Sequence, residues 1–370
     1  MFDLIFDRSD KVNHQKERHL FPGGNTYKGF HSFYKYILTQ EDANRIICMK
    51  GGPGTGKSFL MKKVASHFKD KGYSIEYHHC SSDPSSLDGI VVKELGIAIL
   101  DGTSPHVVDP KHPGAVDEVL NMGVALDTDA LSLKKKEIMD LTRNISENFQ
   151  RAYTFLGSAK FIHEDWSKLN SKALSYSNLS TITESLKEEI FQKHKSGYGS
   201  ERHLFATAFT PDGIITFSNE LILDFKSIFV INGGPGFSKT KILMEVGKTA
   251  QKKGYFVEYM HDPFIPDRLE HIFIPEISTC VLTENEISKC SFKGKVYNIE
   301  EFCDSSILLK SKSEVDYNKN LFYQLTDKSL DFILKAHKLH DDLEEYYIKA
   351  MDYSIVDNLY SNLISNLDRI

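Results

Sequence analysis

The sequence predicts an α/β protein composed of two homologous halves, each with a parallel sheet flanked by helices and a helical segment appended to it. Two observations predict this fold class. The chain repeats itself over almost its whole length, and each copy shows the order strand, glycine-rich loop, helix, strand. Parallel strands need a crossover of a dozen or more residues, which a helix commonly supplies.

The repeat is visible in short identical segments, which include 17–21 with 201–205 and 51–54 with 233–236. The second pair lies at an offset of 182 residues, and the C-terminal parts of the two copies match at an offset of 177. A polar, glycine-containing stretch between them, 192–200, is predicted to be a linker. We therefore expect two domains, 1–195 and 196–370.

Each half is expected to contain the same elements. Apolar runs predict a buried strand before each glycine-rich loop, and a second strand follows the helix; the expected strands are 45–50, 73–79, 227–232 and 255–260, and the first helix covers 59–68. Segments rich in Leu, Lys, Glu and Ser, with few glycines or prolines, predict helical tails at about 131–192 and 313–369.

The composition argues against several classes of protein. A net charge of −6 and a pI near 6.2 make nucleic acid an unlikely partner, because duplex binders usually carry a basic excess. No run approaches the roughly 20 apolar residues that a membrane span needs, so no membrane association is expected. The five cysteines form no C-x-x-C pair, and a cytoplasmic, reducing compartment fits best.

One segment matches a phosphate-binding pattern completely. Residues 51–58 read Gly51, Gly52, Pro53, Gly54, Thr55, Gly56, Lys57 and Ser58, which is G-x-x-x-x-G-K-[ST]. Glycines let successive N–H groups point at phosphate oxygens, and the following helix directs the positive end of its dipole at the same anion. Lys57 is expected to bridge the β- and γ-phosphates, and the Ser58 hydroxyl to ligate Mg²⁺. The expected ligands are therefore ATP and Mg²⁺.

A second acidic group is expected beside the metal. Residues 96–100 are apolar apart from the leading glycine and end at Asp101, at the carboxyl edge of a predicted strand. Asp101 is predicted to hold the Mg²⁺ shell together with Ser58. The alternative is an ordinary strand-end aspartate that caps a turn.

The second copy of the loop is altered. Gly233, Gly234, Gly236, Lys239 and Thr240 are kept as candidate nucleotide-binding residues, but Ser238 replaces the last loop glycine. A side chain at that position is expected to cost on the order of 1–3 kcal/mol. The position of Asp101 is taken by Thr283, so weak phosphate binding is compatible with this half, but efficient Mg²⁺-dependent hydrolysis is not expected.

Groups that act on the nucleotide are harder to assign. Glu94 is a candidate general base, although its counterpart Glu276 in the altered half favours a structural role for both. A proline-rich segment after Asp101, 102–118, has no evident counterpart in the second half. Its polar residues are candidates for binding a substrate or orienting water, with His106 the leading one and Asp109, Lys111 and His112 the others. The alternative is a structural connector.

Further polar residues fit structural roles better. His79 and His261 occur in both copies, and a zinc site among the histidines and cysteines has no clean ligand spacing. Arg18 and Arg202 are candidates for an arginine finger or for stacking on a base, with an ordinary ion pair favoured over both. The tail motifs 163–165 and 340–342 are expected to form a polar face that packs on the core.

The complete loop, the segment 87–90, the run 100–110 and the repeated His-Asp/Glu-Asp tail together resemble a bacterial family of duplicated P-loop proteins, generally labelled ATPase or nucleotide-kinase-like. The resemblance covers nearly the whole chain. It implies ATP binding by the first half, with residues 51–58 as the nucleotide loop and Asp101 as the acid on the magnesium side, and it implies no particular substrate.

Three functions remain open on this basis. The first is a Mg²⁺-dependent ATPase in which the second half is a regulatory or structural copy. The second is a kinase whose acceptor, a small molecule or a nucleotide, binds at 102–118. The third is a nucleotide-gated module that binds an unknown protein partner without turnover. The absence of an N-K-x-D element favours ATP over GTP.

Overall fold

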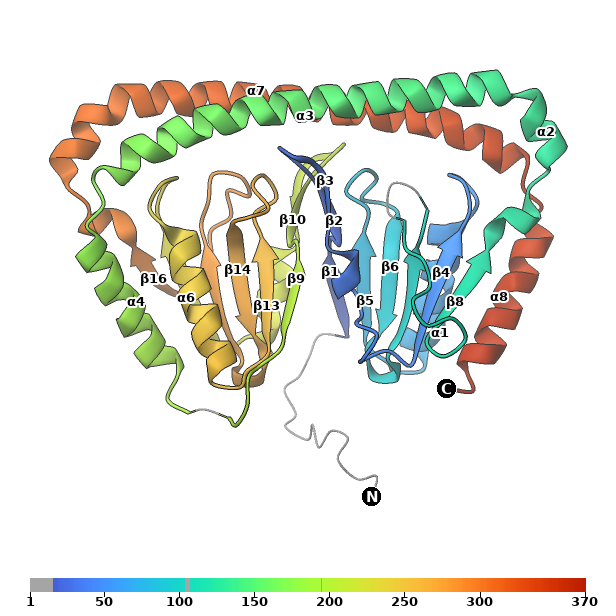
Figure 1. The fold of residues 1–370 in the computed structure, drawn as a ribbon, viewed down its shortest axis with the longest axis horizontal. Coiled ribbons are helices and arrows are strands. Elements are labelled where there is room, and N and C mark those ends of the chain that lie inside the picture. Colours follow the sequence, from blue (N-terminus) through green and yellow to red (C-terminus); the bar gives the residue numbers. More distant parts are fainter. Residues whose placement is uncertain (1–15, 104–106, 194) are drawn as a thin grey trace.

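The computed structural model describes residues 16–103, 107–193 and 195–370. It contains two similar six-stranded sheets, each flanked by helices, which lie side by side under a pair of long helices (Figure 1). The first sheet has the order β1 (Glu17–Leu20), β5 (Ile75–His79), β6 (Leu87–Val92), β7 (Ile97–Asp101), β4 (Arg45–Lys50) and β8 (Asp117–Asn121). The second has β9 (Glu201–Leu204), β13 (Val257–His261), β14 (Leu269–Ile274), β15 (Thr279–Thr283), β12 (Ser227–Asn232) and β16 (Lys295–Asn298) in the equivalent order.

The predicted parallel sheets are wrong in one respect, because both sheets are mixed. β6 runs antiparallel to β5 and to β7, and β14 does the same between β13 and β15. The remaining pairs in each sheet are parallel. The reason is the length of the connections, since 80–86 and 93–96 are long enough for an antiparallel return but too short for a parallel crossover.

The four predicted strands and the helix after the first loop are confirmed within a few residues. α1 (Lys57–Asp70) follows β4, and α6 (Lys239–Lys252) follows β12. Both helices are amphipathic; α1 buries Leu60, Met61, Val64, Ala65 and Phe68 against its sheet. The segment 102–118 has a counterpart after all, because it leads into β8 at the sheet edge just as 284–294 leads into β16.

Two hairpins lie at the centre of the molecule, between the two sheets and beneath the long helices (Figure 1): β2 (Gly23–Thr26) with β3 (Gly29–Ser32), and β10 (Thr207–Thr210) with β11 (Gly213–Thr216). A short helix, α5 (Ser218–Leu221), follows the second hairpin. Tyr153 of the long helix α3 donates from its hydroxyl to Asn25 in the first hairpin at 2.9 Å, so the hairpins connect the sheets to the helices above them.

The predicted tails are helical. They form α2 (Thr128–Leu133), α3 (Lys135–Ser171) and α4 (Tyr176–Ile190) in the first half, and α7 (Ser305–Lys349) and α8 (Tyr353–Leu367) in the second. Side-chain caps begin several of them, as Asp127 does for α2, Asp304 for α7 and Asp352 for α8. α3 and α7 run antiparallel over the tops of both sheets (Figure 1), and Phe155 stacks on Phe332 between them.

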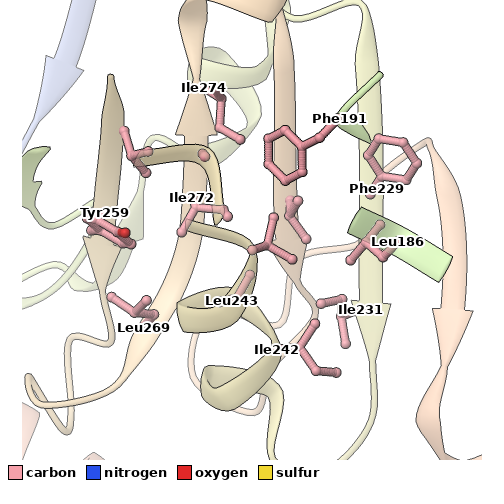
Figure 2. Packing of buried hydrophobic residues seen from close by; sticks show 14 of the residues in the cluster. Leu186, Phe191, Phe229, Ile231, Ile242, Leu243, Tyr259, Leu269, Ile272 and Ile274 are labelled. Atoms are coloured by element: carbon pink, nitrogen blue, oxygen red, sulfur yellow. The ribbon is translucent and has the colours of Figure 1, made fainter. Parts of the chain in front are cut away.

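Each tail ends on the sheet domain of the other half. Leu186 of α4 packs among Ile231, Ile242 and Leu243, which belong to the second half (Figure 2). Conversely, α8 places Val356, Leu363 and Leu367 in the core of the first half. The boundary at 195/196 stays a prediction about the repeat. In the folded chain the two halves exchange their helices.

The halves also meet along β1 and β9. Phe21 and Phe205 exchange backbone hydrogen bonds at 3.0 Å, within an apolar cluster drawn from both halves. Next to them, Arg18 pairs with Glu258 at 2.8 Å and Arg202 pairs with Glu76 at 2.8 Å, so each arginine crosses to the other half.

These arginines and glutamates form a buried network. Burial opposes their charges, but the two carboxylates raise the pKa of Arg18, and the two arginines lower the pKa of Glu76 and of Glu258. The ion-pair interpretation of Arg18 and Arg202 is therefore the one that the structure supports. Among the described residues, no helix combines the length and the apolar character of a membrane span.

Candidate functional site

The loop at 51–56 connects the carboxyl end of β4 to α1. Gly54 and Gly56 have positive φ values of 66° and 81°, a backbone conformation that glycine adopts without the cost of a side chain. Gly56 immediately precedes the first turn of α1. The first amides of a helix have no partner within it, so the loop and the helix start together present N–H groups at the sheet edge.

Lys57 and Asp101, both predicted site residues, are brought together. The Lys57 ammonium lies 3.5 Å from a carboxylate oxygen of Asp101, and both side chains are largely buried. Asp101 ends β7 in parallel register with Met49 of β4, which places it beside the loop. Its other oxygen accepts a hydrogen bond of 2.8 Å from the Thr103 amide, so Asp101 also caps the turn that follows β7.

In this conformation Lys57 is turned back onto the loop. Its ammonium donates to the carbonyl oxygens of Gly51 at 3.1 Å and Gly52 at 2.6 Å. Thr55 is buried and donates to the same Gly52 carbonyl at 2.8 Å, which fixes the curvature of the loop. The lysine therefore has two sets of oxygen partners at the loop, these carbonyls and Asp101.

Ser58 lies on the first turn of α1, where its hydroxyl oxygen accepts a hydrogen bond of 3.0 Å from the Leu87 amide. A hydroxyl has a second lone pair, so this bond orients the oxygen without using all of its acceptor capacity. Thr240 makes the equivalent contact with the Leu269 amide at 3.3 Å in the second half. The shared contact shows that this hydroxyl also ties each helix to its antiparallel strand.

The structure does not bring Glu94 to the loop. Glu94 lies in the turn before β7, at the end of that strand opposite to Asp101, and it accepts a hydrogen bond of 2.9 Å from the Ser74 amide. Glu276 makes the matching bond with the Phe256 amide at 2.8 Å. The pair holds the same turn in both halves, which is the structural role that the sequence favoured.

His106 lies outside the described residues. In the described part of 102–118, Asp109 pairs with Lys50 at 2.7 Å, and Asp117 accepts from the amides of Lys111 and His112 at 2.9 and 2.7 Å. The His112 ring is hydrogen-bonded to Gln40 at 2.8 Å. These polar groups hold the segment to itself and to the sheet edge.

The end of α7 covers the first loop, a feature that the sequence analysis missed. A Cβ added to Gly52 would lie 2.6 Å from the Tyr347 ring, and one added to Gly54 would lie 2.9 Å from the Glu344 carbonyl oxygen. The Gly54 amide donates to the Glu344 carboxylate at 3.2 Å. The glycines of this loop are therefore needed by the approach of a helix as well as by any phosphate.

The second loop has a similar path with different chemistry. Ser238, at the position of Gly56, has a φ of 56°, so a residue with a side chain occupies the left-handed conformation. Burial lowers the pKa of Lys239, whose ammonium donates to the carbonyl oxygens of Gly233 and Glu284. Thr283 is buried and donates its hydroxyl to the Glu270 carbonyl at 2.8 Å, where the first half has the carboxylate of Asp101.

This second loop borders a cavity of about 240 Å³, lined by residues that include Lys239, Arg268, Asp262, Glu270 and Glu286. Burial raises the pKa of Asp262, and it raises that of Glu270 to about 7. Burial also opposes the charge of Glu286, but the hydrogen bond and charge of His163 lower its pKa to about 2. Three buried acids stand against two cations, Lys239 and Arg268, in this lining, and that balance disfavours the binding of a polyanion.

The remaining candidates lie between the halves or under the long helices. His79 contacts His19 at 2.8 Å and His261 contacts His203 at 2.7 Å, while the other ring nitrogens of His79 and His261 bond to the Pro84 and Pro266 carbonyls. Within the described residues, no group of three or more His, Cys, Asp or Glu is placed to hold a metal ion. The tail residue His163 lies buried against Glu286, whereas its counterpart His340 lies 3.7 Å from Glu344.

Comparison with known proteins adds one local similarity. A family model described as Nephrocystin 3, N-terminal, matches residues 30–91, a segment that contains β4, the first loop, α1, β5 and most of β6. No curated protein and no solved structure matches the chain. The similarity concerns the segment that carries the complete loop, and it covers well under half of the chain.

Proposed function

We propose that the N-terminal half binds ATP with Mg²⁺ through residues 51–58 and hydrolyses it, and that the C-terminal half is a degenerate copy with a structural or regulatory role. The observation that carries the proposal is the position of Lys57 beside Asp101 at the end of β7, where the first turn of α1 also begins. A cation, an acid and helix amides at one sheet edge form the set that phosphate and its metal require.

The residues present fit these ligands. The Gly54 amide already donates to an oxyanion, the carboxylate of Glu344, so the loop presents at least one N–H to a negatively charged oxygen. Asp101 and the Ser58 hydroxyl supply the hard oxygen ligands that Mg²⁺ prefers. Lys57 would neutralise phosphate charge after leaving the Gly51 and Gly52 carbonyls. The bound metal would contribute charge neutralisation at the phosphates.

We favour hydrolysis over transfer to an acceptor. An acceptor site needs polar groups that are available to a ligand, and three in the described part of 102–118 already have partners: Asp109 pairs with Lys50, Asp117 accepts from backbone amides, and His112 contacts Gln40. The third hypothesis, a binding module without turnover, predicts tight nucleotide binding, negligible release of phosphate and a partner that is recovered in only one nucleotide state.

The test uses the full chain and two lysine variants on the same helix. Calorimetry with Mg²⁺ should detect ATP binding by the wild type, and phosphate should be released without an added acceptor. Lys57→Ala should weaken ATP binding by roughly 10- to 100-fold, because a charge-assisted hydrogen bond contributes about 1.5–3 kcal/mol. Lys62→Ala, which removes an exposed lysine that donates to the Ser85 carbonyl, is the matched control.

Four results would count against the proposal. Absence of ATP binding by the folded full chain would refute it outright. Equal losses in Lys57→Ala and Lys62→Ala would show that the loop is not the site. Phosphate release that appears only when an acceptor is added would favour the kinase, and tight binding without any release would favour the binding module.

A further inference from the structure

The last turns of α7 bring a carboxylate to the complete phosphate loop. The Gly54 amide donates to Glu344 Oε1 at 3.2 Å, while the Tyr347 ring lies over Gly52 and Ile348 lies against Gly54. α7 belongs to the C-terminal half of the chain. The group that contacts the N-terminal loop is therefore contributed by the other half.

A bound triphosphate and Glu344 would compete for the same amide. Loop amides of this pattern are the donors for phosphate oxygens, and an N–H that is given to a carboxylate is not available to a second oxyanion. Two negative groups at hydrogen-bond distance from one donor also repel each other. Binding of a phosphate oxygen at Gly54 thus requires the Glu344 carboxylate to leave.

The side chain can leave without movement of its helix. The end of α7 is fixed to the first half by two backbone hydrogen bonds of 2.8 Å, from the Asp127 amide to the Ala350 carbonyl and from the Asp352 amide to the Ala125 carbonyl. The Glu344 side chain is about one-third exposed, and His340 lies 3.7 Å from its carboxylate one turn earlier. Rotation about the glutamate side-chain bonds is therefore enough to free the Gly54 amide.

The equivalent helix at the altered loop carries no such acid. Ser167 of α3 stands at the position of Glu344, and its backbone carbonyl approaches Gly236 so closely that an added Cβ would lie 2.0 Å away. Asn170, at the position of Tyr347, donates to the Pro235 carbonyl at 2.8 Å. The carboxylate thus faces only the loop that retains Asp101 and its full glycine pattern.

We propose that Glu344 is an autoinhibitory gate that occupies the place of a phosphate oxygen on the N-terminal loop until a nucleotide displaces it. This inference rests on the proposed function, since it assumes that the displacing ligand is a triphosphate. It gives the C-terminal half a defined regulatory task, which is to set the affinity of the N-terminal site through α7.

The experiment compares Glu344→Ala with Glu345→Ala in the full chain. Glu345 is the next residue on the same helix, but it is exposed and pairs with Lys349 at 2.8 Å, so it controls for loss of one acidic charge. Calorimetry with Mg²⁺ and ATP should show about ten-fold tighter binding for Glu344→Ala and no change for Glu345→Ala. Glu344→Gln keeps an acceptor without the charge and should give a smaller gain.

A second measurement does not depend on nucleotide. Hydrogen exchange of the peptide containing 51–56, in the absence of ATP, should be faster in Glu344→Ala than in the wild type, because the Gly54 amide loses its acceptor. Thermal unfolding should be similar in the three variants and the wild type, since Glu344 is partly exposed.

Unchanged or weaker ATP binding in Glu344→Ala would overturn the gate. A fall in turnover without a gain in affinity would also overturn it and would make Glu344 part of the reaction. If no variant and no wild-type protein bound ATP, while exchange at 51–56 still rose in Glu344→Ala, the contact would stand and the proposed function itself would be the part that failed.

Discussion

The two glycine-rich loops of this protein share a backbone path but differ in the side chains around it. Both follow a buried strand, both precede a 14-residue helix, and both are covered by a helix from the opposite half. Where Gly56 has a φ of 81°, Ser238 has a φ of 56°, and where Asp101 ends its strand, Thr283 is buried. The comparison shows that a loop can keep this shape without keeping the groups that bind phosphate. The close approach of a helix is by itself a sufficient reason for glycine in the loop.

The largest expected effect tests whether helix packing demands the glycines of the altered loop. Gly236→Ala should lower the free energy of unfolding by about 3 kcal/mol or more, since its Cβ would lie 2.0 Å from the Ser167 carbonyl oxygen at a φ of 92°. Gly72→Ala has a φ of 94° and nothing within 4 Å, so it should cost only about 1 kcal/mol. Denaturant titration measures both; equal losses would show that backbone strain alone explains the glycine.

The next effect concerns the metal. Asp101→Asn should remove most of the increase in ATP affinity that Mg²⁺ produces, roughly 10-fold or more, because a carboxylate is a far better magnesium ligand than an amide. Thr283→Val should leave that increase unchanged, since Thr283 bonds to the Glu270 carbonyl inside the altered half. The check is calorimetry with and without Mg²⁺. A variant Asp101→Asn that kept its full magnesium response would leave the aspartate as a turn cap only.

A smaller effect is a pH-dependent stability that comes from a buried acid, Glu270, beside the altered loop. Burial raises the pKa of Glu270 to about 7, so the folded state binds this proton more tightly than the unfolded state. The stability that Glu270 contributes is therefore complete below about pH 4.5 and lost as the pH rises through 7. Glu270→Gln should exceed the wild type in stability by on the order of 2 kcal/mol at pH 8 and by much less at pH 5.

The matching measurement is denaturant unfolding of both proteins across this pH range. The difference between them isolates Glu270 from the buried histidines, whose lowered pKa values make the folded state less stable as the pH falls below about 6.5. A stability difference that does not depend on pH would mean that Glu270 does not titrate in this window.

The smallest effect concerns the altered loop position. Ser238→Gly should raise the free energy of unfolding by about 1 kcal/mol, because the left-handed conformation disfavours a side chain. Gly56→Ser should lower it by a similar amount. Denaturant titration measures both variants. Changes in stability of opposite sign would confirm that the two loops share one backbone geometry. A destabilised Ser238→Gly would show that the serine side chain has a role of its own.

Much of this fold could be predicted because its signals are local. Apolar runs, the loop pattern and the helix-forming tails each lie within a few residues of the elements they specify. The strand β6 was not predicted, and its antiparallel direction follows from the length of 80–86, since a segment that short cannot make a parallel crossover. The exchange of helices was missed because it depends on packing between the two halves, such as that of Leu186 with Ile231 and that of Val356 with Leu60, and no local pattern records such packing.

For the candidate site, too, the residues marked by local patterns were predicted and those that depend on distant contacts were not. Lys57, Ser58 and Asp101 were identified from spacing along the chain, and the structure places Lys57 and Asp101 together. Glu94 precedes β7 and Asp101 ends it, so the length of the strand separates the two side chains and Glu94 holds a turn at the opposite edge of the sheet. The contact of Glu344 with the loop was not predicted, because nothing in the sequence of a helical tail marks this residue. The length of the helix was a clue: 45 residues, about 68 Å, exceed the size of one such domain, so the helix must reach the neighbouring half.

The exchanged helices bear on how this chain could have arisen and on whether its halves can be produced separately. A duplicated sequence whose copies trade their terminal helices has the connectivity of a swapped two-fold dimer after fusion of its two polypeptides. Cutting the chain between Lys193 and Lys195 would regenerate that dimer, and each fragment made alone would expose the apolar surface that its sister's α4 or α8 covers. We therefore expect neither copy to fold alone, and the pair should refold only when both fragments are present.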